Sequence, residues 1–140
     1  MKTTVKIKIR GYHIDHFQHV NNARYLEFLE EGRWHYSEKN NLISIFHQKG
    51  ISHVTVNINI NYKRSAVVGE VLRIETSLIR KNRKSVTMLQ QVFLNDTDTL
   101  IADAQVTNVF LYINSGKVMP INEELIRLWP DIAKRNQITH

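Results

Sequence analysis

Residues 11–32, GYHIDHFQHVNNARYLEFLEEG, decide how this sequence folds. The stretch begins as a polar loop with one aspartate, Asp15, and three histidines, and it passes through Asn21 and Asn22 into the most apolar helical pattern of the chain. An asparagine at either position is a good helix N-cap because its side-chain oxygen accepts a hydrogen bond from a free backbone N–H. The pattern predicts a loop that delivers polar side chains to a helix N-terminus, where unpaired N–H groups favour negative charge.

The predicted helix extends to about Glu38, with Gly32 inside it. Apolar side chains cover much of its circumference and glutamates form one polar stripe: Tyr25, Leu26, Phe28, Leu29 and Trp34 against Glu27, Glu30 and Glu31. A helix this apolar has to be covered on most of its sides. We expect Gly32 to allow close packing against the element that covers it.

Five other segments have the character of strands. Apolar and polar residues alternate with a period of two at residues 3–9, 51–62 and 71–79, and further strands follow at 86–94 and 100–113. Short turns join the last three segments, which indicates antiparallel pairing. We expect residues 42–49 to form a helical turn or an apolar flap. Asn122 is expected to be the N-cap of a short C-terminal helix. The predicted fold class is α+β, an antiparallel five-stranded sheet wrapped around one long central helix.

The composition limits the classes of protein to which this sequence can belong. With 140 residues, 42% of them hydrophobic and 23% charged, the chain is typical of a soluble globular protein with one domain over residues 1–140. The absence of cysteine excludes disulfides and cysteine-based zinc sites. No apolar run approaches the roughly 20 residues that span a bilayer, and the N-terminus lacks the pattern of a signal peptide, so we expect a cytoplasmic protein. The net charge of +6 favours anionic ligands such as nucleic acid, anionic lipid or a phosphorylated small molecule.

Two sequence blocks carry a resemblance to a known family. Residues 10–31, RGYHIDHFQHVNNARYLEFLEE, and residues 56–64, VNININYKR, resemble the hotdog-fold acyl-CoA thioesterases of the 4-hydroxybenzoyl-CoA thioesterase type. Among these the blocks are most similar to the bacterial long-chain acyl-CoA thioesterases called thioesterase III. The resemblance implies a hotdog fold, an acyl-CoA substrate, no cofactor and no metal. It also implies a homodimer or homotetramer with its sites at a subunit interface.

The resemblance also assigns the candidate catalytic residues. By position, Asp15 matches the family's catalytic carboxylate, and Asn22 matches the residue whose backbone N–H points at the thioester carbonyl. His19 belongs to the same motif, and we expect it to orient the loop by hydrogen bonding. An ionised aspartate can act as general base or as direct nucleophile, and the sequence leaves both roles open. A lone aspartate in such a loop is more often a turn residue, so the catalytic assignment rests on the motif.

The candidate substrate-binding residues are polar or basic. We expect Asn61 to contact the ligand, although Asn57, Asn59 and Asn61 could equally be polar packing on the outer face or at a subunit interface. The basic residues at strand ends and at a hairpin tip could bind the phosphates of CoA or could be ordinary solvated charge: Lys63, Arg64, Arg80, Lys81, Arg83 and Lys84. The apolar segment 42–46 could line an acyl channel, whereas Leu26 and Leu29 are better explained as core.

The sequence predicts an enzyme that hydrolyses medium- or long-chain acyl-CoA, with several alternatives. An aryl-CoA or short-chain thioesterase uses the same chemistry, and a non-catalytic binder of acyl-CoA or acyl carrier protein would need Asp15 only to order the loop. A zinc site built from His13, His16 and His19 is disfavoured because no second ligand cluster follows. A nucleic-acid module is disfavoured because no aromatic-basic binding motif is present, and we expect no membrane insertion.

Overall fold

The computed structural model describes residues 1–134. In chain order the elements are β1 (Lys2–Lys8), the 3-10 turn η1 (Gly11–His13), α1 (Asn22–Lys39), α2 (Leu42–Lys49), β2 (Ile51–Tyr62), β3 (Val71–Lys81), β4 (Ser85–Leu94), β5 (Leu100–Tyr112), β6 (Val118–Met119), α3 (Glu123–Leu128) and η2 (Pro130–Lys134).

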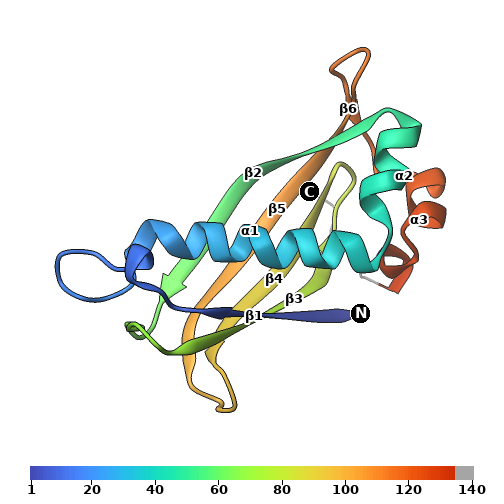
Figure 1. Cartoon of the computed structure of the whole chain (residues 1–140). Coiled ribbons are helices and arrows are strands. Elements are labelled where there is room, and N and C mark those ends of the chain that lie inside the picture. Colours follow the sequence, from blue (N-terminus) through green and yellow to red (C-terminus); the bar gives the residue numbers. More distant parts are fainter. Residues whose placement is uncertain (135–140) are drawn as a thin grey trace.

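The strands form one antiparallel sheet in the order β1-β3-β4-β5-β2, and the two-residue strand β6 pairs with β5. Figure 1 shows α1 lying across one face of this sheet, with the preceding loop at one end and α2 and α3 at the other. The predicted α+β architecture is therefore confirmed, with β6 as a short addition. No helix within residues 1–134 has the length and apolar character needed to cross a membrane.

The central helix lies unusually close to the sheet at Gly32. A Cβ atom at this position would lie 2.8 Å from side-chain atoms of Gln90, Ile74 and Thr76. Real Cβ atoms do not approach other heavy atoms this closely, so glycine is what allows α1 to sit at this depth. The expectation that Gly32 serves close packing is confirmed.

Two apolar clusters fill the space between α1 and the sheet. The first lies under the N-terminal half of α1, where Phe28 and Leu29 pack on residues of β3, β4 and β5. The second lies under the C-terminal half, where Tyr36 packs with Phe46 of α2 and Phe110 of β5. Residues 42–49, predicted as a helical turn or a flap, form a complete helix that closes this end. Its flanking residues, Asn41 and Gly50, both adopt the left-handed conformation (φ 58° and 67°) that separates α2 from its neighbours.

A bulge in β2 interrupts the predicted alternation of that strand. The pairing with β5 passes from Thr55 opposite Asn108 to Asn57 opposite Thr107, which leaves Val56 without a partner. After the bulge Ile58 faces α1, as expected; before it, Val54 and Val56 are 40% and 54% exposed. The expectation of one unbroken apolar face over residues 51–62 is therefore wrong, because the extra residue reverses the side-chain phase.

Candidate active site

The loop that carries Asp15 is fixed by backbone hydrogen bonds. The N–H of Asp15 donates to the carbonyl oxygen of His19 (2.9 Å), and the N–H of Gln18 donates to that of Asp15 (3.0 Å). One carboxylate oxygen of Asp15, Oδ1, accepts the N–H of Phe17 (2.9 Å). The other oxygen accepts no hydrogen bond from residues 1–134, so it is available to a water molecule or a ligand.

A buried histidine, His13, anchors the start of this loop. Its Nδ1 accepts the backbone N–H of Arg10 (2.9 Å), and its ring packs edge-on against Phe28 with centroids 5.1 Å apart. Burial, together with the charge of Arg24, lowers the pKa of His13 below 6.5 and keeps the ring neutral at pH 7. His13 is therefore a buried structural residue of the loop and not a solvent-exposed metal ligand.

The other two histidines of the motif are exposed. The ring of His19 makes no hydrogen bond to the described part of the chain, so the orienting contact comes from its backbone carbonyl and not from its side chain. Within residues 1–134, no three histidine, cysteine or acidic side chains are grouped so that they could hold a metal ion.

The helix N-terminus follows directly after the loop. Asn21 is the N-cap, since its Oδ1 accepts the N–H of Ala23 (2.9 Å). Asn22 is the first helical residue and is exposed, and its N–H donates to no acceptor among residues 1–134. Its carbonyl oxygen accepts the hydroxyl of Tyr62 (3.1 Å), which ties the end of β2 to the start of α1. One backbone donor is thus free at the positive end of the helix dipole.

A pocket of about 350 Å³ opens beside this helix N-terminus. Its lining brings together three of the predicted residues with others from the helix and the end of β2: Val20, Asn22, Tyr25, Tyr62, Lys63, Arg64 and Ser65. Asp15 lies in the preceding loop and does not line the pocket within one chain. Tyr25 and Tyr62 were missed as pocket residues because aromatic side chains within an apolar helix or strand pattern look like core in a sequence, although Tyr62 is 47% exposed. The available signal for Tyr62 was its place in the block VNININYKR, directly before Lys63.

The remaining predicted residues lie elsewhere on the chain. Asn61 is on the outer sheet face, where its amide donates to Asp103 (3.1 Å), as the alternative of outer-face polar packing predicted. Arg83 and Lys84 are in the β3–β4 turn. The register places this turn beside Val109, at the end of the sheet away from the Asn22 pocket. These three residues are therefore not part of the pocket within one chain.

The loop, the helix N-terminus and the wrapped sheet together define the class of protein. The chain belongs to the thioesterase-like superfamily, whose pattern it matches over residues 9–128. It is 43% identical over 120 residues to the long-chain acyl-CoA thioesterase FadM of Escherichia coli strain K12, a match that covers 86% of this chain and 91% of that protein.

Solved structures give the same result. The crystal structure of YbaW of Escherichia coli, described as a probable thioesterase, matches with a TM-score of 0.84 at 39% identity, over 94% of this chain and 98% of that chain. Slr0204 of Synechocystis, a 1,4-dihydroxy-2-naphthoyl-CoA thioesterase, shares the fold with a TM-score of 0.81 at 15% identity, over 95% and 98% of the two chains. The predicted hotdog fold and thioesterase family are thus confirmed.

Proposed function

We propose that this protein hydrolyses medium- and long-chain fatty acyl-CoA to free fatty acid and CoA. The observation that carries the proposal is the 43% identity over 120 residues to a long-chain acyl-CoA thioesterase. The family match over residues 9–128 includes the loop and the helix N-terminus. The free backbone N–H of Asn22 beside an aspartate-bearing loop supports it, since thioester hydrolysis needs an oriented nucleophile and an oxyanion donor.

In this proposal Asp15 acts through its free carboxylate oxygen. As a general base it takes a proton from water while the water oxygen attacks the thioester carbonyl carbon. As a nucleophile it attacks that carbon itself, and water then hydrolyses the resulting anhydride. In both routes the carbonyl oxygen becomes negative and accepts the N–H of Asn22, the C–S bond breaks, and CoA leaves as a thiolate. The role of His19 is to hold the loop through its backbone carbonyl.

Substrate binding is proposed to involve a second copy of the chain. β2 is twelve residues long and lies at the edge of the sheet, and its outer edge is unpaired within residues 1–134. Antiparallel pairing of two β2 strands would bring Arg83 and Lys84 of one copy towards the Asn22 end of the other. Lys63 and Arg64 would then bind CoA phosphates together with that pair, and Asn61 would lie near the shared surface. The assembly is a homodimer or homotetramer of single-domain chains in the cytoplasm.

The test is free thiol release from a series of acyl-CoAs, from acetyl to palmitoyl plus benzoyl. We expect kcat/KM to rise with chain length. Asp15→Asn is expected to lower kcat about 10²- to 10⁴-fold, the range of general acid–base catalysis. Asp98→Asn, in the exposed β4–β5 turn, is the matched control and should leave kcat unchanged. Turnover of benzoyl-CoA alone would contradict the long-chain assignment, and full activity of Asp15→Asn would contradict the site.

A further inference from the structure

A second hollow lies under the C-terminal half of α1, where α1, α2 and β2 meet. Its inner part, about 30 Å³, has polar lining from Arg33, Ser37, His53 and Asn108, and the rest of its lining is apolar or aromatic. It adjoins a wider part of about 110 Å³ at Thr55. An apolar groove adjoins both parts and is lined mainly by Trp34, Leu42, Ile43, Phe46, Ile51 and Ile113. None of these residues lines the pocket beside Asn22, so the two hollows are separate within one chain.

The guanidinium of Arg33 is the cation of this hollow. Its NH1 donates to Oε1 of Gln90 (3.0 Å), and Gln90 is itself fixed by hydrogen bonds to the carbonyl oxygen of Leu29 (2.8 Å) and to Thr76 (3.0 Å). No carboxylate within residues 1–134 lies within 4.0 Å of Arg33, although the exposed Glu30 lines the outer part of the hollow. A half-buried guanidinium with most of its donors unused is suited to bind an anion.

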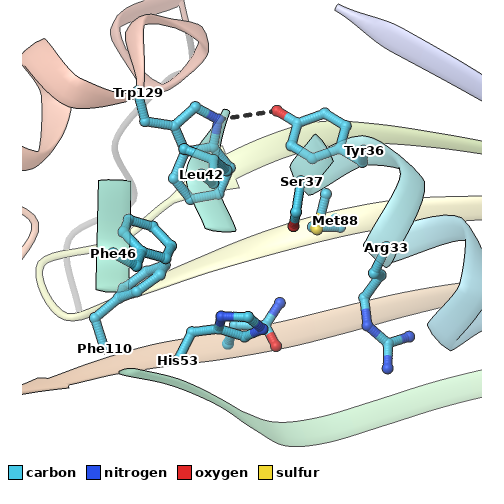
Figure 2. A pocket seen from close by; sticks show the side chains of 10 residues that line it. Arg33, Tyr36, Ser37, Leu42, Phe46, His53, Met88, Phe110 and Trp129 are labelled. Atoms are coloured by element: carbon cyan, nitrogen blue, oxygen red, sulfur yellow. Dashed lines mark hydrogen bonds between the residues drawn. The ribbon is translucent and has the colours of Figure 1, made fainter. Parts of the chain in front are cut away.

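A buried donor also faces the inner hollow. Asn108 is 5% exposed, and its Oδ1 accepts the hydroxyl of Thr55 (2.7 Å). Its amide nitrogen donates to no atom of residues 1–134 and is not sealed from solvent, so it can donate to a ligand or water in the hollow. Figure 2 shows that Arg33, Ser37 and His53 point into one space, with Phe46 and Phe110 on its other side.

We propose that this hollow, the Arg33 pocket, binds the carboxylate of a ligand with a long apolar chain. The unused donors of Arg33 and Asn108 match the acceptor-only oxygens of a carboxylate, and the guanidinium can bind both oxygens at once. The adjoining groove would take the chain, since Trp34, Ile43 and Phe46 offer it an apolar surface. The ligand is a free fatty acid or the far end of an acyl chain that carries a second carboxylate. The geometry of the pocket carries this proposal without the hydrolysis proposed above.

The first test uses the two tryptophans of the chain as reporters, because Trp34 and Trp129 both line this region. Decanoate, decan-1-ol and decylamine are titrated below their micelle concentrations, and tryptophan emission is recorded. The three probes share one chain length and differ in the head group. We expect decanoate to bind about 10- to 100-fold more tightly than decan-1-ol, the range of a hydrogen bond to a charged group. Equal affinities would overturn the proposal.

Two variants and a control locate the binding. Arg33→Gln removes the cation, and Asn108→Asp keeps the shape and the bond from Thr55 but places a resident carboxylate in the pocket. Both should abolish the preference for decanoate. Arg24→Gln, on the same helix but outside the pocket, should keep it. If Arg33→Gln fails to fold, Asn108→Asp decides the question. If Asn108→Asp still prefers decanoate, the carboxylate binds outside the Arg33 pocket and the proposal is overturned.

A second measurement tells the two ligand sources apart. Hydrolysis of hexadecanoyl-CoA and of its ω-carboxy counterpart is compared in the wild type and in Arg33→Gln. A loss at least tenfold greater for the ω-carboxy substrate would assign the pocket to the far end of an acyl chain. Loss of decanoate binding in the titration without that selectivity would assign it to a free fatty acid. If no thioester is hydrolysed at all, the proposed function fails, while the titration with decanoate still tests the Arg33 pocket.

Discussion

The two ends of α1 are built in different ways. At its N-terminus, an exposed loop holds Asp15 by backbone hydrogen bonds, and the neighbouring pocket is open to solvent. At its C-terminus, four aromatic side chains from α1, α2, β5 and the segment after α3 pack edge to face with ring centroids 5.6 to 6.4 Å apart: Tyr36, Phe46, Phe110 and Trp129. The indole N–H of Trp129 also donates to the Tyr36 hydroxyl (3.0 Å).

The residues that stabilise the fold and the residues proposed to catalyse the reaction therefore lie at opposite ends of α1. The aromatic end buries large apolar surfaces and carries none of the groups proposed to react. The loop end carries those groups, and its exposed side chains contribute little to the core. Substitutions at the aromatic end should therefore change the free energy of unfolding, and substitutions at the loop end should change kinetic constants. The following predictions test that separation.

The largest effect on stability is expected for Phe110→Ala. The side chain is 1% exposed and touches two rings of the aromatic cluster, so its removal leaves a cavity that should cost about 3–5 kcal/mol of unfolding free energy. Urea denaturation measures the loss. Phe17→Ala, with a ring 76% exposed in the loop, is the control and should cost no more than about 0.5 kcal/mol. Similar losses in both variants would contradict the separation.

Gly32→Ala tests the middle of the helix, where the two ends meet. The added methyl group would overlap three side-chain atoms at 2.8 Å, so we expect a loss of about 1–3 kcal/mol, typical of an overpacked core. Thermal and urea unfolding measure it. Gly11→Ala is the matched control, because a Cβ there has no heavy atom within 4 Å. A Gly32→Ala variant as stable as the wild type would show that the sheet can yield beneath α1.

Replacing Lys63 and Arg64 together by glutamine should weaken substrate binding at the loop end. Both residues line the Asn22 pocket, and Arg64 is held 3.4 Å from Glu70. Exposed charges contribute modestly, so we expect KM for hexadecanoyl-CoA to rise about 3- to 10-fold with kcat little changed. The rise should shrink as salt is added. Lys39→Gln, at the far end of α1, serves as the control. An unchanged KM in the double variant would remove both residues from the site.

The smallest effect concerns pH and His13. Because burial lowers its pKa in the folded state, the unfolded chain binds a proton below pH 6.5 that the folded chain does not. This contribution to stability is complete above pH 6.5 and is lost as the pH falls towards the folded pKa. Urea unfolding at pH 7.5, 6.5 and 5.5 should show a shallower decline in His13→Asn than in the wild type. Burial also lowers the pKa of His53, so some decline remains in the variant. The exposed-site variant His16→Asn should match the wild type.

Local signals in the sequence predicted most of the fold. Asn21 caps α1 through its own side chain, and period-two alternation identified the strands, because these depend on neighbouring residues alone. The bulge at Val56 was missed because a strand's register is set by its partner strand. The anchoring role of His13 depends on contacts with Arg10 and Phe28, and the Arg33 pocket depends on Gln90, 57 positions away. Such contacts leave no periodic trace in one sequence.

The bulge in β2 also determines which side chains of this strand line the hollow under α1. Because of the one extra residue, His53 and Thr55 lie on the side of α1 and Val54 lies on the outer face. If the bulge lay at the start of the strand instead, Val54 and Val56 would point inward and His53 and Thr55 would point outward. The β2 wall of the hollow would then be apolar, while Arg33, Ser37 and Asn108 would still line its other sides. The position of the bulge in β2 is thus one feature by which relatives of this protein could acquire different ligands.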